Sequence, residues 1–90
     1  MNPRNRWEIF LDILKVMSEE EQESNGKVKK TRIMQRALLD WRNFQKYFTF
    51  LLEHGFIGEI DAPKEGTCYE LTEKGHDLMG KLRDVERILR

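Results

Sequence analysis

Five polar side chains between residues 42 and 49 have the chemistry to read the edges of DNA bases. They are Arg42, Asn43, Gln45, Lys46 and Thr49. Arginine can bond guanine, and asparagine or glutamine can bond adenine, through two hydrogen bonds each. Lysine can equally bind a phosphate oxygen. Because a solvated helix face normally carries the same residue types, the set becomes informative only together with the element that presents it.

The apolar residues among these polar ones predict a helix over residues 40–54. They recur at three- and four-residue steps, as Phe44, Tyr47, Phe48, Leu51 and Leu52. This stripe would hold one face of the helix against a core and leave the five polar residues mostly outward. Asp40 is the expected N-cap, and Gly55 is expected to end the helix in the left-handed conformation.

A shorter helix is predicted just before it, over residues 31–38. Its inward residues are expected to be Ile33, Met34, Ala37 and Leu38. Thr31 can cap its start, where free N–H groups and the positive dipole end suit a phosphate oxygen, with Lys30 and Arg32 beside it. Capping alone would also explain Thr31. The tight joint between the two helices indicates a helix-turn-helix, whose second helix enters the major groove of DNA.

Trp41 directly follows the predicted cap of this second helix. Its indole has apolar faces and one polar N–H group, so it suits either of two roles. The ring could stack on a sugar of the DNA backbone, or it could pack inward and fix the angle at which the helix begins. We expect inward packing.

Charge is balanced over the chain but unevenly distributed along it. The 16 basic and 16 acidic residues give a net charge of zero, which argues against a polycation that coats nucleic acid. Residues 27–46 nevertheless hold seven basic residues against Asp40, a net charge of +6. An acidic cluster precedes them and is followed by a turn signal at residues 24–26; its members are Glu19, Glu20, Glu21 and Glu23. We expect residues 19–26 to form a mobile loop whose acidity serves solvation.

Three further elements are predicted around the helix-turn-helix. A helix over residues 4–18 has an apolar stripe formed by Trp7, Phe10, Leu11, Leu14 and Met17. A β-hairpin over residues 56–71 has a long turn-rich tip at residues 61–67, which would place Lys64 and Thr67 beside a duplex. Thr72 can cap a last helix over residues 73–90.

The last helix has a heptad-like apolar stripe. Its members are Leu78, Leu82, Val85 and Leu89, at steps of four, three and four residues. An apolar seam that projected from the core would be unfavourable in water, so we expect it to join two copies of the chain in a homodimer. The alternative is that Leu78 and Leu82 pack against the first helix of their own chain.

No arrangement typical of catalysis is visible, and we expect that the protein is not an enzyme. Cys68 is the only cysteine, which excludes an intramolecular disulfide. His54, Cys68 and His76 are separated by 14 and 8 residues, a spacing that fits no zinc site, so no metal is expected. No apolar stretch approaches the roughly 18 residues of a membrane-spanning helix, and no signal peptide is recognisable. The expectation is a cytoplasmic, nucleoid-associated protein without a cofactor or a small-molecule substrate.

A family resemblance rests on the run KKTRIMQRALLDWRNFQKYFTFLLEHGFI and on YELTEKG after it. From about Trp7 to Leu89, the chain resembles the archaeal winged helix-turn-helix family of small DNA-binding regulators and chromatin-type proteins. The resemblance implies a mainly helical α+β fold of one domain over residues 1–90, with a recognition helix at residues 40–54 and a wing around residues 61–67. In several members the last helices form an antiparallel coiled coil between two subunits. The wing here carries Asp61 and Glu65 against a single Lys64.

The expected function is therefore binding of double-stranded DNA and regulation of transcription. The expected contact residues are Lys30, Thr31, Arg32, Trp41, Arg42, Asn43, Gln45, Lys46, Thr49, Lys64 and Thr67. One alternative keeps the fold as a protein-interaction module that does not bind DNA. RNA binding is indicated only by residues 55–58, a G-x-x-G pattern that joins two helices in a KH fold. Here the pattern joins a helix to a strand, which disfavours RNA.

Overall fold

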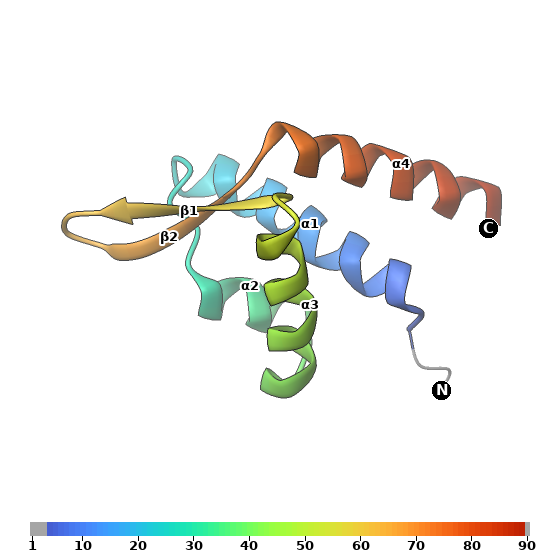
Figure 1. The fold of residues 1–90 in the computed structure, drawn as a ribbon, viewed down its shortest axis with the longest axis horizontal. Helices are drawn as coiled ribbons and strands as arrows, with labels where there is room; N and C mark the ends of the chain where they lie inside the picture. The colour runs from blue at the N-terminus through green and yellow to red at the C-terminus, as the bar shows by residue number, and fades with distance from the viewer. Residues whose placement is uncertain (1–3, 90) are drawn as a thin grey trace.

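A computed structural model of the protein describes residues 4–89 and confirms the predicted order of elements. The elements are α1 (Arg6–Glu23), α2 (Lys30–Arg36), α3 (Trp41–Glu53), β1 (Ile57–Ala62), β2 (Gly66–Leu71) and α4 (Glu73–Leu89). In Figure 1, α3 stands across α1, while the β-hairpin and the end of α4 extend in opposite directions. Residues 1–3 and Arg90, which the predicted domain and last helix include, lie outside the described residues.

The core forms where α1 meets α3 and the hairpin. Ile13, Leu14 and Met17 of α1 are fully buried, as are Phe44 and Phe48 of α3. The rings of Phe44 and Phe48 stack at a centroid distance of 4.9 Å. Full burial of each such side chain stabilises the fold by about 1.5–3 kcal/mol. The predicted apolar stripes of α1 and α3 therefore do face the core.

Helix α1 is longer than the predicted helix over residues 4–18. It continues to Glu23, so the expectation of a mobile loop from residue 19 is wrong. The physical reason is that Glu20 is only 5% exposed and pairs with two arginines of α2. Glu21 also accepts a hydrogen bond of 2.6 Å from the backbone N–H of Leu71 in β2. Tertiary partners thus extend the helix by another turn.

The joint between α2 and α3 differs from the prediction in detail. Helix α2 spans Lys30–Arg36, one residue earlier at its start and two at its end than predicted, and its N-cap is Lys29 instead of Thr31. Leu38 was expected to face inward, but it has a φ of 56° and is 84% exposed. Arg4 holds this turn by donating to the backbone oxygens of Ala37 and Leu38, at 3.0 and 3.1 Å. Asp40 caps α3 as predicted, since its side chain accepts from the N–H of Asn43 at 2.8 Å.

The hairpin is an antiparallel pair whose register runs from Ile57 opposite Leu71 to Ala62 opposite Gly66. Its tip is shorter than the predicted seven-residue turn, because residues 61, 62, 66 and 67 belong to the strands. Gly66 has a φ of 79°, a conformation that favours glycine. Val28, between α1 and α2, forms an isolated bridge with Tyr69 and so brings the α1–α2 linker beside β2.

Helix α4 packs closely at its start, while most residues of its last turn are exposed. A Cβ atom on Gly75 would lie 2.1 Å from the backbone oxygen of Phe56, so only glycine allows this approach. Leu78 and Leu82 pack against the core of their own chain, as the alternative reading of the stripe predicted. Val85 and Leu89, by contrast, are 37% and 63% exposed, and the neighbouring Ile88, which was not part of the predicted seam, is 80% exposed. The predicted four-residue seam is therefore divided between the core and the surface.

Candidate nucleic-acid interface

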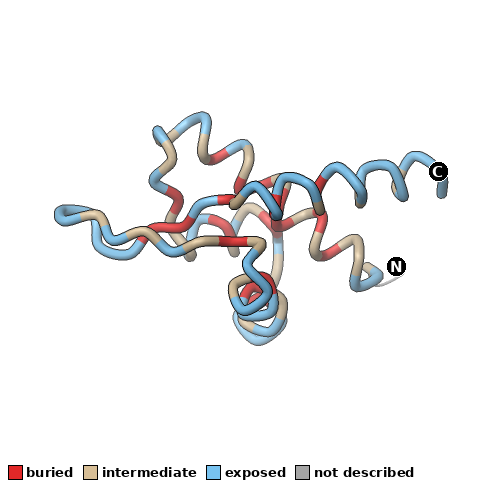
Figure 2. Tube along the Cα trace, turned by 45° about the horizontal axis from the view of Figure 1, so that its top comes forward, coloured by how far each residue is buried: buried red, intermediate tan, exposed pale blue. Residues whose placement is uncertain are grey.

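The outer face of α3 presents four of the five predicted base-reading residues. Arg42, Asn43, Lys46 and Thr49 are exposed, while the apolar stripe of the same helix is buried. Figure 2 shows α3 projecting from the body, with exposed positions along its outer side. Neither Arg42 nor Lys46 forms an ion pair with another residue of the described chain. Their charges remain available to a ligand.

Gln45 does not share this outward orientation. It is only partly exposed, and its Oε1 atom is buried without a hydrogen-bond partner within residues 4–89. Helical geometry explains the position, because Gln45 lies four residues after the exposed Trp41 and three before the buried Phe48. The side chain is at the edge of the core, so the expectation that it faces outward is wrong.

Trp41 is more open than expected. The indole is 53% exposed, and its centroid is 6.4 Å from that of Phe44. The Nζ atom of Lys30 lies 5.2 Å from the Trp41 ring centroid and 5.3 Å from that of Phe48, in cation–π geometry. The predicted inward packing of Trp41 is therefore wrong. Instead, Lys30 and Trp41 together form a partly exposed pair at the start of α3.

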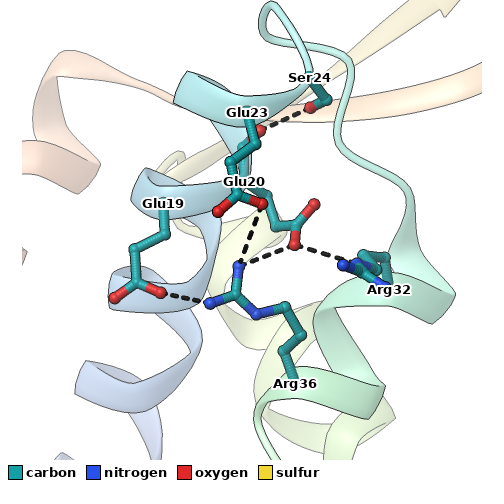
Figure 3. A network of polar contacts seen from close by, with 6 residues as sticks. All are labelled: Glu19, Glu20, Glu23, Ser24, Arg32 and Arg36. Carbon is teal, nitrogen blue, oxygen red and sulfur yellow. Dashed lines mark hydrogen bonds and ion pairs between the residues drawn. The ribbon is translucent and has the colours of Figure 1, made fainter.

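The arginines of α2 are held by carboxylates of α1 (Figure 3). Arg32 donates from Nε to Glu20 at 3.0 Å, and Arg36 donates to Glu20 at 2.7 Å and to Glu19 at 2.5 Å. The hydrogen bond from Arg36, and then that from Arg32, lowers the pKa of Glu20 although burial opposes the shift. Glu23 lies 3.9 Å from Arg36 and completes the group. We call these five residues the α1–α2 ion cluster.

The sequence pattern did not lead us to predict that the acidic residues of this cluster hold α1 and α2 together. A signal was present, because Glu20 lies three residues after Met17 and continues the spacing of the buried stripe. A buried carboxylate requires a charged or hydrogen-bonding partner. The nearby basic segment could supply one, but which arginine would reach it depends on how α1 and α2 cross.

The hairpin tip gains positive charge from a segment distant in sequence. Lys64 and Thr67 are exposed, as predicted for contact residues. Lys27 of the linker forms an ion pair of 3.2 Å with Glu65. The Nζ atom of Lys29 lies 3.9 Å from the position of a Cβ atom on Gly66. Sequence reasoning omitted both linker lysines from the site, because only the bridge of Val28 with Tyr69 places them beside the tip.

Neither a metal-binding cluster nor a membrane-spanning helix is found among the described residues. Within residues 4–89, no three His, Cys, Asp or Glu residues are placed to hold a metal ion. In the same part of the chain, no helix is long and apolar enough to cross a membrane. Cys68 is a buried free thiol. The exposed polar face of α3, with the basic residues around it, is thus the candidate site that the structure favours.

Sequence comparison gives related proteins over nearly the whole chain. Residues 3–90 match the family described as winged helix-turn-helix. Two uncharacterized proteins of Methanocaldococcus jannaschii are 41% and 36% identical over 86 residues, which is 96% of this chain. The chain spans 77% of the first relative but only 36% of the second.

Two solved structures share the fold. Sso10a-2, a DNA-binding protein from Sulfolobus solfataricus, has a TM-score of 0.75 and 27% sequence identity, over 94% of this chain and 81% of that protein. The PcaV transcriptional regulator from Streptomyces coelicolor has a TM-score of 0.73 and 17% identity, over 88% of this chain and 57% of its own. At that identity the second likeness concerns the fold alone.

Proposed function

The chain belongs to the winged helix-turn-helix family, and from this premise we propose that it binds double-stranded DNA and regulates transcription. The observation that carries the proposal is the outer face of α3. There Arg42 and Lys46 are exposed and have no carboxylate partner in the described chain, and Asn43 and Thr49 are exposed on the same helix. The similarity to Sso10a-2, a DNA-binding protein, supports the same reading.

The proposed complex places α3 in the major groove. Arg42 and Asn43, in the first turn of the helix, would contact base edges, and Lys46 and Thr49 would follow along the same face. Lys30 and Thr31 at the start of α2 would contact a phosphate, with the Trp41 ring against a sugar. Arg32 remains partly exposed beside Glu20, so its contribution would be smaller.

The hairpin would supply a second contact with the backbone. Lys64 and Thr67 at the tip were expected there, and Lys29 joins them from the linker. Because Lys27 is already paired with Glu65, we assign it a smaller part. The contact is therefore built by two chain segments and is more basic than the hairpin alone.

We also propose that the end of α4 joins two copies of the chain. Val85, Ile88 and Leu89 are exposed there, while Leu78 and Leu82 pack against the core of their own chain. A short apolar stripe of this kind is stabilised when it pairs with a second helix. Light scattering at micromolar concentration tests the assembly. A mass twice the 10.8 kDa of the chain supports it, and a mass equal to one chain contradicts it.

Fluorescence anisotropy of a labelled random-sequence duplex tests DNA binding directly. The protein is titrated across a salt series, together with the variant Arg42→Glu/Lys46→Glu. We expect micromolar affinity that falls with salt at a slope of about −0.9 per phosphate neutralised, and loss of binding in the variant.

The matched control is Lys81→Glu/Arg83→Glu, because it changes the net charge equally at two exposed positions of α4. This control is expected to retain most of the affinity. No binding of the folded protein at low salt would contradict the proposal and favour a protein-interaction module. Equal losses in both variants would contradict the assignment of the contact to α3.

A further inference from the structure

A small hollow lies between the start of α1 and the middle of α3. Its lining residues are Arg6, Phe10, Lys46, Tyr47 and Phe50. The ring of Phe10 is 5.2 Å from those of both Tyr47 and Phe50, edge-on to the first and tilted to the second. Phe50 is 43% exposed although it is one of the largest apolar side chains of the protein. His54 also packs against the Phe50 ring, at a centroid distance of 4.1 Å, so the aromatic surface that the hollow offers is the part of Phe50 that remains exposed, together with the edge of Phe10.

The charges around this hollow have one sign. Arg6 and Lys46 are both exposed, and no carboxylate is among the lining residues. Neither cation forms an ion pair with another of residues 4–89. The Nζ atom of Lys46 lies 5.6 Å from the ring centroid of Tyr47, so one cation is already positioned beside the aromatic surface. The combination of ring faces and unpaired cations is complementary to a ligand with a ring and a negative charge.

We propose that this hollow binds a small planar aromatic carboxylate. The ligand ring would lie against Phe10 and Phe50, where offset or edge-to-face contact is favourable. Its carboxylate would be bound by Arg6 and Lys46, through charge-assisted hydrogen bonds. An aliphatic acid would lack the ring contact, and a neutral ring would leave the cations without a partner. Because the hollow is open and such a ligand has only about ten non-hydrogen atoms, the expected dissociation constant is about 1 mM.

Occupation of the hollow would also alter the proposed DNA contact. Lys46 belongs both to this hollow and to the outer face of α3. A carboxylate bound to Lys46 withdraws its charge from a phosphate or a base, so ligand and DNA would weaken each other's binding by the same factor. This second part rests on the proposed function, whereas the ligand site does not.

Titration of the full chain with benzoate, followed by backbone amide NMR, tests the site without DNA. We expect saturable shifts centred on residues 6, 10, 46, 47 and 50. Acetate carries the charge without the ring, and benzyl alcohol carries the ring without the charge. Each should bind at least about tenfold more weakly than benzoate, because it can make only one of the two interactions. Shifts that are scattered, that do not saturate, or that are equal for acetate would overturn the proposal.

Two variants connect the binding to the named side chains. Phe50→Ser and Lys46→Gln are both expected to weaken benzoate binding about fivefold, since the first removes a ring contact and the second removes a cation that binds the carboxylate. Both positions are exposed, and an unchanged dispersion of the remaining signals shows that the fold is retained. Arg83→Gln on α4 is the matched control for loss of a cation and should leave the affinity unchanged. Retention of full affinity in Phe50→Ser would overturn the site.

Anisotropy of the labelled duplex at increasing benzoate tests the coupling. The expected result is a DNA dissociation constant that rises as the hollow fills, with no such rise for acetate at the same ionic strength. Benzoate binding together with unchanged DNA affinity would overturn the coupling and leave the site intact. Absence of DNA binding would instead overturn the proposed function, and the NMR titration would still decide the site.

Discussion

The basic residues of α2 and those of α3 are of the same types, but their surroundings in the fold differ. Arg32 and Arg36 of α2 donate to carboxylates of α1 within 3.0 Å. Arg42 and Lys46 of α3 are exposed and have no carboxylate partner in the described chain. The first pair holds two helices together, while the second pair remains available for a ligand. A count of charges along the chain does not distinguish these roles.

This difference changes the meaning of the charge of +6 between residues 27 and 46. The α1–α2 ion cluster compensates Arg32 and Arg36, and Glu65 compensates Lys27. The charge that remains uncompensated is concentrated at Lys29, Lys30, Arg42 and Lys46. The acidic segment of α1 is thus part of the scaffold of the helix-turn-helix, because it determines which cations of α2 are already paired within the chain.

The largest expected effect concerns stability and comes from the buried side of this comparison. Glu20→Gln removes the charge that both α2 arginines share. We expect the free energy of unfolding to fall by about 2 kcal/mol, less than for a fully buried pair because Arg32 and Arg36 reach solvent. Urea denaturation measures the change. The control Glu53→Gln, at an exposed position of α3, should stay within about 0.5 kcal/mol of the parent protein. If Glu20→Gln lowered the free energy of unfolding by no more than about 0.5 kcal/mol, the cluster would contribute little to stability.

The same carboxylate predicts how stability depends on pH. Because its arginine partners lower the pKa of Glu20 below the ordinary value of 4.5, its contribution is fully present above that value and is lost as pH falls through the lowered pKa. Thermal denaturation between pH 7 and pH 2 should therefore show a decrease at acid pH that is smaller in Glu20→Gln. Parallel pH profiles of the two proteins would contradict the assignment to this group.

DNA affinity separates the arginines of the two helices. Arg42→Gln is expected to raise the dissociation constant about tenfold and to reduce the salt slope by about 0.9, as for loss of one direct contact. Arg32→Gln should raise it no more than about threefold, because its charge is already shared with Glu20. Anisotropy titrations at equal folded fraction make the comparison. Equal effects of the two substitutions would show that ion pairing in the free protein does not decide which arginine contacts DNA.

The smallest expected effect compares the two linker lysines beside the hairpin. Lys29→Gln should weaken DNA binding about threefold and reduce the salt slope by nearly one. Lys27→Gln removes a lysine that is paired with Glu65, so its effect should be smaller than that of Lys29→Gln. The same anisotropy assay measures both. A larger effect from Lys27 would indicate that the ion pair opens when DNA binds.

Local patterns in the sequence determined the elements and their order. The apolar stripes of α1 and α3, the cap at Asp40 and the hairpin signals involve residues only a few positions apart, and the structure confirms them. Such features depend on helix and strand geometry, which neighbouring residues decide. The outward residues of α3 could be predicted for the same reason, except at the edge of the stripe, where Gln45 is only partly exposed.

Only the tertiary structure decided where α1 ends, which cations are neutralised, and which residues lie beside the hairpin tip. These outcomes depend on pairs such as Glu20 with Arg32 and Glu21 with Leu71, which are 12 and 50 residues apart. The energy of such an ion pair or hydrogen bond depends on distance and burial, and neither is encoded in a local pattern. The sequence therefore determined which residues carry charge, and the packing of α1 on α2 and of the linker on β2 decided which of these charges are paired within the chain.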